Sequence, residues 1–149
     1  MSVHFSSKSD MWETPEALFD KLHAIHDFTF DVCATPENAK CPRFYTPEMD
    51  GLKQTWTGVC WMNPPYGKVI KHWVKKAYES ATTGDAKVVC LLPARTDTGW
   101  WHDYVIPYGK IEFLRGRLRF VNRALPSYRD DGKFKISSAP FPSAIVIFE

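Results

Sequence analysis

The segment Asn63-Pro64-Pro65-Tyr66 combines the residue types with the clearest chemical potential in the chain. Each proline fixes its own φ and favours extended geometry in the residue before it, so the segment is stiff. The prolines have no N–H donor, and the free polar groups are therefore mainly acceptors: the side-chain oxygen of Asn63 and the carbonyl oxygen of Pro64. Tyr66 adds a flat aromatic surface. Two acceptors beside an aromatic ring suit a planar ligand that carries an exocyclic NH2 group.

An exocyclic amino group on an aromatic ring is a poor nucleophile, because its lone pair is delocalised into the ring. Hydrogen bonds to both amino hydrogens return electron density to the nitrogen, which can then attack an adjacent methyl sulfonium in line. Such a reaction depends on positioning and electrostatics more than on a general base. The segment therefore indicates methyl transfer to a planar amino group; the alternative is a rigid turn with no chemical role.

The surrounding sequence places this turn between a short apolar strand and an amphipathic helix. Residues 59–62 are apolar, and the stripe of Val69, Trp73 and Ala77 predicts a helix over residues 68–80. Upstream, Thr14-Pro15 predicts a helix start, with Thr14 as the N-cap and Pro15 in the first helical position. The other expected elements are strands at 28–32, 87–92, 111–114, 118–120 and 143–148, a short helix at 99–106 that stops at Pro107, and a polar loop at 121–142.

Strands alternate with helices along the chain, which predicts an α/β fold with a mostly parallel sheet. The final strands lack a clear intervening helix and predict antiparallel strands at the C-terminal edge. We expect residues 1–11 to form a flexible tail and residues 12–149 to form a single domain. Ligands of such sheets bind at the carboxyl ends of the strands, where residues 31–34, 63–67 and 92–97 are expected.

Charge and cysteine content narrow the class of protein. The 149 residues carry a net charge of +2, which excludes a strongly basic histone-like binder. Residues 110–135 nevertheless hold eight Lys and Arg against three Asp and Glu, which fits contact with an anionic polymer or a solvated face that binds nothing. The four cysteines show no metal-binding spacing, so we expect no metal site, and Cys60 and Cys90 are expected to be buried. The longest apolar run, residues 88–92, is too short for a membrane span and the N-terminus is polar, so we expect a cytoplasmic protein.

Motifs along almost the whole chain form a combination more specific than any one of them. They are Trp12-Glu13-Thr14-Pro15, Leu18-Phe19, Asp31-Val32-Cys33-Ala34, Asn38-Ala39-Lys40-Cys41, Asp50-Gly51-Leu52, Trp56, residues 63–67, residues 92–97, Trp101-His102 and residues 116–120. This combination resembles the phage-type DNA N-6-adenine methyltransferases, a small Dam-like family. The resemblance implies a minimal Rossmann-like methyltransferase fold, S-adenosylmethionine (SAM) as cofactor, a phage or prophage origin and a bacterial cytoplasm as the place of work.

The resemblance also implies roles for individual residues. Those that match the catalytic motif are Asn63, Pro64, Pro65 and Tyr66. Those that match cofactor-binding segments are Trp12, Thr14 and Pro15 near the methionine end of SAM, Asp31, Cys33 and Ala34 in the first cofactor loop, and Asp50 near the adenine or ribose end. The first cofactor loop lacks the usual glycine-rich signature. Without the resemblance, Asp31, Thr14 and Asp50 are as readily turn or cap residues.

The implied substrate is duplex DNA, from which the target adenine must be flipped because a stacked base cannot reach the pocket. Residues expected to contact phosphate are Lys68, Arg95, Arg115, Arg117 and Arg119. Arg117 and Arg119 alternate with Leu118 and Phe120 and so are expected on one strand face, whereas Arg95 could instead pair with Asp97. The alternatives are a methyltransferase acting on RNA adenine or a protein glutamine amide, and a nucleic-acid-binding module without catalysis.

Overall fold

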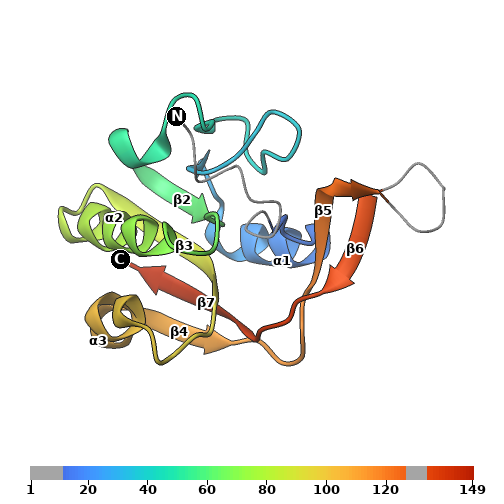
Figure 1. Cartoon of the computed structure of the whole chain (residues 1–149). Helices are drawn as coiled ribbons and strands as arrows, with labels where there is room; N and C mark the ends of the chain where they lie inside the picture. The colour runs from blue at the N-terminus through green and yellow to red at the C-terminus, as the bar shows by residue number, and fades with distance from the viewer. Residues whose placement is uncertain (1–11, 127–133) are drawn as a thin grey trace.

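The computed structural model describes residues 12–126 and 134–149. The tail expected at 1–11 and part of the loop expected at 121–142 lie outside the described residues. In chain order the elements are α1 (Glu16–His26), β1 (Phe30–Asp31), the 3-10 helix η3 (Gly51–Lys53), β2 (Gly58–Met62), α2 (Ile70–Thr82), β3 (Ala86–Pro93), the π-helix η4 (Trp101–Val105), α3 (Ile106–Tyr108), β4 (Lys110–Phe113), β5 (Arg119–Pro126), β6 (Phe134–Ser138) and β7 (Ser143–Phe148). Figure 1 shows their arrangement.

A five-stranded sheet with the order β1-β2-β3-β7-β4 forms the centre of the molecule, and β5 and β6 form a separate two-stranded ribbon. The pairs β1–β2 and β2–β3 are parallel, whereas β7 runs antiparallel to both of its neighbours, β3 and β4. The expected α/β class with a parallel centre and antiparallel C-terminal strands is thus confirmed, and it is consistent with a Rossmann-like methyltransferase fold. The carboxyl ends of β1, β2 and β3 meet at one edge, where such sheets bind ligands.

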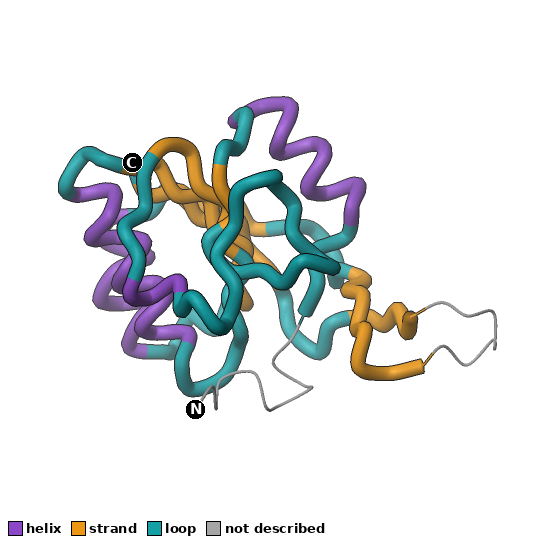
Figure 2. Tube along the Cα trace, turned by 90° about the horizontal axis from the view of Figure 1, so that it is seen from above, coloured by secondary structure: helices purple, strands orange, loops and turns teal. Residues whose placement is uncertain are grey.

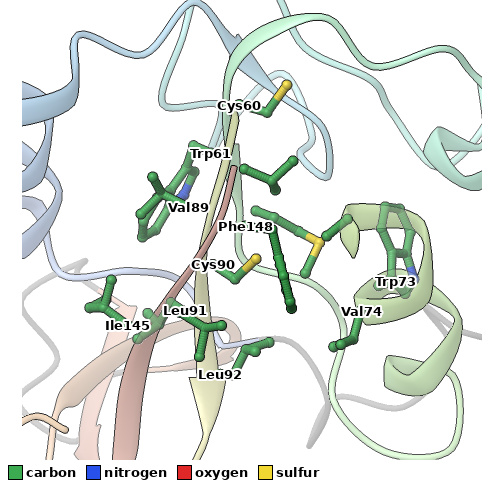
Figure 3. Packing of buried hydrophobic residues seen from close by; sticks show 14 of the residues in the cluster. Cys60, Trp61, Trp73, Val74, Val89, Cys90, Leu91, Leu92, Ile145 and Phe148 are labelled. Atoms are coloured by element: carbon green, nitrogen blue, oxygen red, sulfur yellow. The ribbon is translucent and has the colours of Figure 1, made fainter. Parts of the chain in front are cut away.

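Both faces of the sheet are covered, with α1 on one side and α2 and α3 on the other (Figure 2). Strand β3 is fully buried from Val88 to Leu92, as expected for a central strand that reads as a continuous apolar run. Trp61 on β2 packs against Phe19 of α1, and Trp73 of α2 lies on the opposite side of the sheet (Figure 3). Cys60 and Cys90 are buried, which confirms the expectation for these two thiols.

The start of α1 differs from the sequence expectation. The helix begins at Glu16, its N-cap residue is Pro15, and no side chain caps it. The prediction of Thr14 as the N-cap is therefore wrong. The physical reason is a competing partner, because the Thr14 hydroxyl accepts a hydrogen bond from the side chain of Asn63 at 3.0 Å.

The prediction of a polar loop at 121–142 is also wrong, since β5 and β6 occupy most of the described part of this segment. They pair antiparallel from Arg119 opposite Ser138 to Pro126 opposite Phe134, and residues of the ribbon contact Glu13 through an isolated bridge to Val121. Backbone pairing of this kind needs no alternation of apolar residues, so polar composition conceals it. Strand β7 coincides with its expected bounds, and the ends of β1, β2, α2, β3 and β4 shift by no more than two residues. The helix expected at 99–106 is a π-helix followed by α3, which continues through Pro107.

Candidate active site

The stiff turn after β2 lies at the carboxyl edge of the sheet, where the sequence places it. Pro64, Pro65 and Tyr66 are buried, and the Tyr66 hydroxyl donates to the carbonyl oxygen of Leu91 on β3 at 3.2 Å. Burial raises the pKa of the Tyr66 phenol well above its ordinary value, so Tyr66 remains a neutral donor. The hydroxyl therefore ties the turn to the central strand.

The side chain of Asn63 has one end satisfied and one end free. Its Nδ2 donates to the backbone carbonyl oxygen of Trp12 and, at 3.0 Å, to the hydroxyl of Thr14. Its Oδ1 is buried and has no hydrogen-bond partner within the described part of the chain. Because the Trp12 carbonyl oxygen can only accept a hydrogen bond, the Asn63 atom that contacts it must be the NH2 nitrogen. The other end of the amide is therefore Oδ1. A buried acceptor without a partner is rare in folded proteins and marks a place for a donor from a ligand.

Tyr66 of this turn belongs to a cluster of four aromatic rings. Tyr66 is 3% exposed and contacts Phe120 and Phe141 edge-on, with ring centroids 6.5 Å and 5.4 Å away. Trp12 packs edge-on against the same two rings at 5.5 Å and 5.4 Å. The flat surface expected of Tyr66 is thus covered by neighbouring aromatic side chains. The cluster joins the N-terminal segment, the turn and the segment around the β5–β6 ribbon.

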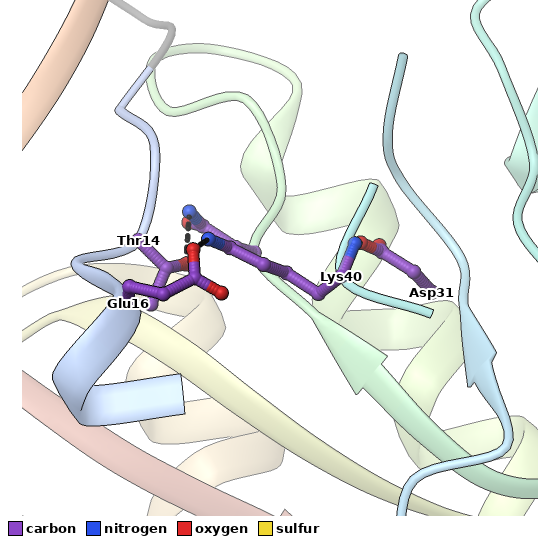
Figure 4. Close-up of polar contacts among 5 residues, drawn as sticks. Thr14, Glu16, Asp31 and Lys40 are labelled. Atoms are coloured by element: carbon purple, nitrogen blue, oxygen red, sulfur yellow. Dashed lines mark hydrogen bonds and ion pairs between the residues drawn. The ribbon is translucent and has the colours of Figure 1, made fainter. Parts of the chain in front are cut away.

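Asp31 lies at the end of β1 and organises the loop that follows it. Its carboxylate accepts the backbone N–H of Cys33 at 3.2 Å. It also accepts the backbone N–H of Lys40 at 3.0 Å (Figure 4). The Lys40 ammonium in turn pairs with Glu16 at 2.7 Å. Desolvation raises the pKa of Asp31 to about 7, although both backbone donors oppose the shift. The sequence left two roles open for Asp31, in a turn or in cofactor binding. The observed contacts show that it anchors the loop.

Three predicted cofactor residues, Cys33, Ala34 and Asp50, line one hollow beside that loop. Its other lining residues are Tyr45, Thr46, Pro47, Gly51 and Trp73. The hollow is partly open to solvent, and the empty space within it, counted to its mouth, is about 190 Å³.

Two of these lining residues are distinctive, Trp73 in its hydrogen bonding and Gly51 in its packing. The indole N–H of Trp73 is buried and has no partner among the described residues. At Gly51, a side chain would collide with the carbonyl oxygen of Val32 and the ring of Trp73, so glycine is required for the close approach. Asp50 itself accepts the N–H of Leu52 at 3.2 Å at the start of η3, which is the turn role that the sequence left open.

The structure divides the predicted cofactor residues into two groups. Trp12 and Thr14 contact Asn63, and Pro15 follows them as the N-cap of α1. None of these three lines the hollow that contains Cys33, Ala34 and Asp50. The two groups are nevertheless linked, because Asp31 anchors the loop whose Lys40 pairs with Glu16 at the start of α1.

The residues expected to contact phosphate are all exposed: Lys68, Arg95, Arg115, Arg117 and Arg119. The Arg95 guanidinium lies over the ring of Phe141 at 5.4 Å, and no ion pair joins Arg95 to Asp97, both of which the structure describes. Exposed Arg119 precedes fully buried Phe120, which confirms the expected alternation there. Arg117 lies just before β5 rather than within it.

Sequence reasoning missed several residues of this region. Phe141 fell in the segment expected to be a loop, and Trp73 was assigned only to the apolar stripe of a helix. Tyr45 lies in a proline-containing stretch without periodicity, and no local signal identifies it. The aromatic character of all three is the one feature that could have directed attention to them.

Two kinds of feature are absent from the described residues. No group of three or more His, Cys, Asp or Glu side chains gathers in residues 12–126 or 134–149 in a way that could hold a metal ion. No helix in the same part of the chain is long and apolar enough to cross a membrane.

Comparison with known proteins agrees with this geometry. The family model described as DNA N-6-adenine-methyltransferase (Dam) matches residues 2–148. The chain is 30% identical over 147 residues to the DNA N-6-adenine-methyltransferase of Haemophilus phage HP1, which covers 96% of this chain and 80% of that protein. It is 34% identical over 95 residues to the DNA N-6-adenine-methyltransferase of Escherichia phage T1, which covers 62% of this chain and 39% of that longer protein. The chain therefore belongs to the DNA N-6-adenine-methyltransferase (Dam) family.

Proposed function

We propose that this chain transfers a methyl group from SAM to the exocyclic N6 amino group of an adenine that is flipped out of duplex DNA. The observation that carries the proposal is the Oδ1 atom of Asn63, a buried acceptor that has no partner among the described residues. An adenine amino group supplies the missing donor. Family membership supports the same reaction class.

The residues of the turn account for activation of the amino group. Asn63 Oδ1 and the carbonyl oxygen of Pro64 accept its two hydrogens, which returns lone-pair density to the nitrogen. SAM, when bound, would supply an electrophilic methyl group and depart as the neutral thioether. The methylated nitrogen then loses one of its two protons to solvent as the product base leaves the turn. The buried surroundings exclude water from the turn and strengthen these hydrogen bonds, so that preorganised acceptors contribute most of the rate.

Asp50 gives the hollow an acceptor that suits part of SAM. Its carboxylate suits ribose hydroxyls or an adenine amino group. Cys33 and Ala34 complete its wall, and Asp31 holds their loop in place. Trp12, Thr14 and Pro15 remain our candidates for the methionine end.

Tyr66 is proposed as the aromatic partner of the flipped base. Its ring is covered by Phe120 and Phe141, so the base must displace at least one of these edge-on contacts to stack on it. Phe141 also carries the guanidinium of Arg95, so a phosphate-binding candidate lies beside a ring that the base would displace. Entry of the base and contact of Arg95 with the DNA backbone would then both involve the side chain of Phe141.

The exposed basic residues are proposed to hold the DNA backbone. Lys68 follows the catalytic turn directly, and Arg119 lies next to Phe120 of the aromatic cluster. Phosphate contacts of this kind position a duplex without reading its sequence. The phage sources of the two relatives support a bacterial cytoplasm as the place of action.

The decisive experiment expresses the protein in a methylation-deficient bacterial host and maps modified bases in its DNA. We expect N6-methyladenine with wild type and none with Asn63→Ala, while calorimetry gives SAM affinities within about twofold for both proteins. Methyl incorporation into RNA or protein but not DNA would favour the RNA adenine or glutamine alternative. Absence of SAM binding by the wild type would favour a binding module without catalysis.

A further inference from the structure

Residues 12–14 hold the side-chain amide of Asn63 from two sides. The Trp12 carbonyl and the Thr14 hydroxyl both accept from Nδ2, the latter at 3.0 Å. Thr14 is 4% exposed, and its hydroxyl does not cap α1. A buried hydroxyl directed at a catalytic side chain, rather than at the nearest helix end, points to a role in positioning that side chain.

The two contacts fix the direction of the amide. Each hydrogen of Nδ2 has an acceptor, which leaves Oδ1 as the free end. If the amide of Asn63 rotated by half a turn, Oδ1 would face the carbonyl oxygen of Trp12, and two acceptors would oppose each other. The acceptor that the target amino group requires would be lost in that orientation.

The same segment is fastened to the β5–β6 ribbon. Glu13 N–H donates to the Val121 carbonyl at 3.1 Å, and Val121 N–H donates to the Glu13 carbonyl at 3.2 Å. The ring of Trp12 packs against Phe120, which precedes Val121 on β5. Figure 1 shows the ribbon projecting away from α2 and α3, so this pairing joins an outlying element to the catalytic turn.

We propose that Thr14 is a positioning residue for Asn63, and that the Glu13–Val121 pairing ties this positioning to the ribbon. The inference rests on the proposed function, since it needs Asn63 Oδ1 to accept from the target amino group. It adds a role that cofactor binding does not require. The ribbon overlaps the basic stretch at 110–135, so residues 12–14 join an element suited to contact DNA to the catalytic amide.

The first test compares Thr14→Val, which removes the hydroxyl at nearly constant shape, with Thr14→Ser, which retains it. Methyl transfer to duplex DNA is measured in a single turnover at saturating SAM, and SAM affinity is measured by calorimetry. We expect Thr14→Val to slow transfer about tenfold, the loss of roughly one hydrogen bond, even at a SAM concentration that saturates the variant. Thr14→Ser is expected to keep the rate within about threefold of the wild-type rate.

A second readout does not depend on activity. The side-chain NH2 signals of Asn63, assigned by their loss in Asn63→Ala, report hydrogen exchange by NMR in the protein without DNA. We expect both protons to be protected in the wild type and in Thr14→Ser. In Thr14→Val, the Nδ2 proton that has lost its acceptor should exchange faster. The Nδ2 proton that is hydrogen-bonded to the Trp12 carbonyl should remain protected.

The link to the ribbon is tested with Val121→Pro, which removes the N–H that donates to Glu13. Val121→Ala shortens the side chain but keeps this N–H. We expect the proline variant to slow single-turnover transfer and to speed exchange of the Asn63 protons. The alanine variant should retain the protection of those protons.

The outcomes separate this inference from the proposed function. No N6-methyladenine from the wild type would overturn the proposed function itself. An active wild type together with a Thr14→Val protein that equals it in transfer rate and in NH2 protection would overturn the positioning role alone. Wild-type protection in a folded Val121→Pro protein would overturn the link to the ribbon.

Discussion

Asp31 accepts the backbone N–H of Lys40 at 3.0 Å, which places a carboxylate inside the loop that it anchors. Asp31 is 2% exposed, and desolvation raises its pKa from 3.8 to about 7. The ammonium of the same Lys40 points to Glu16 instead, at 2.7 Å (Figure 4). Asp31 therefore depends on backbone donors rather than on an ion pair, and its protonation state bears on the stability of the fold.

The first prediction concerns pH and stability. Since the pKa of Asp31 is about 7 in the fold and near 3.8 in the unfolded chain, the folded state binds more protons between these values. The free energy of unfolding should therefore fall as pH rises from about 4 to 7, by up to about 1.4 kcal/mol per pH unit from this group. Denaturant unfolding at four pH values in this window measures the slope.

Two variants isolate the contribution of Asp31. Asp31→Asn cannot ionise, so its stability should fall less steeply with pH than that of the wild type. Asp97→Asn, in an exposed loop, should follow the wild-type slope. Equal slopes for wild type and Asp31→Asn would show that Asp31 does not titrate in this range.

The second prediction separates the ring of Tyr66 from its hydroxyl. Tyr66→Phe loses the hydrogen bond to Leu91, which should cost about 1 kcal/mol of stability, but it keeps a stacking surface and should transfer methyl groups at near wild-type rate. Tyr66→Leu fills much of the space without a π-surface and should lose the roughly 1–3 kcal/mol that base stacking contributes. Single-turnover rates and unfolding curves of both variants decide this. Equal transfer rates for Tyr66→Phe and Tyr66→Leu would show that Tyr66 does not stack on the base.

The parts of the fold that follow from local sequence were predictable. Two prolines after an apolar strand, followed by an apolar stripe at helical spacing, specified β2, the turn and α2 to within two residues of the observed bounds. The buried apolar runs of β3 and β7 were equally direct. In each case the signal and the structure involve the same few residues.

The parts that depend on distant partners were not predictable in this way. Thr14 has the local signature of a helix cap, yet its hydroxyl bonds to Asn63, 49 residues away. The β5–β6 ribbon is held by backbone pairing, which leaves no side-chain pattern in a polar sequence. The hollow combines Ala34, Asp50 and Trp73 from three segments, and only the fold brings them together.

The third prediction concerns the hollow. Asp50→Ala should weaken SAM binding about tenfold, because it removes the carboxylate that lines the hollow and is suited to ribose hydroxyls or an adenine amino group. Asp97→Ala, with the same change of charge outside the hollow, should bind SAM as the wild type does. Calorimetry gives both affinities, and circular dichroism verifies that the fold is intact. A wild-type affinity for Asp50→Ala would reduce Asp50 to the cap of η3.

The fourth prediction concerns DNA and the exposed basic residues. Each true phosphate contact releases counterions, so the logarithm of affinity falls with the logarithm of salt concentration by about 0.9 per contact on duplex DNA. Arg117 is exposed just before β5, and Arg117→Ala should lower the magnitude of this slope by about one while weakening binding to most sequences alike. SAM affinity should not change, because Arg117 does not line the hollow.

The matched control for that experiment is Lys21→Ala, an equal loss of charge at an exposed position of helix α1. General loss of positive charge weakens DNA binding by lowering the long-range field of the whole protein, and both variants share that effect. A direct contact adds counterion release, which changes the slope and not only the affinity at one salt concentration. DNA affinity is therefore measured over a salt series for wild type, Arg117→Ala and Lys21→Ala. A lower slope for Arg117→Ala alone would place the duplex on the segment before β5, whereas three parallel lines would make Arg117 part of a solvated face.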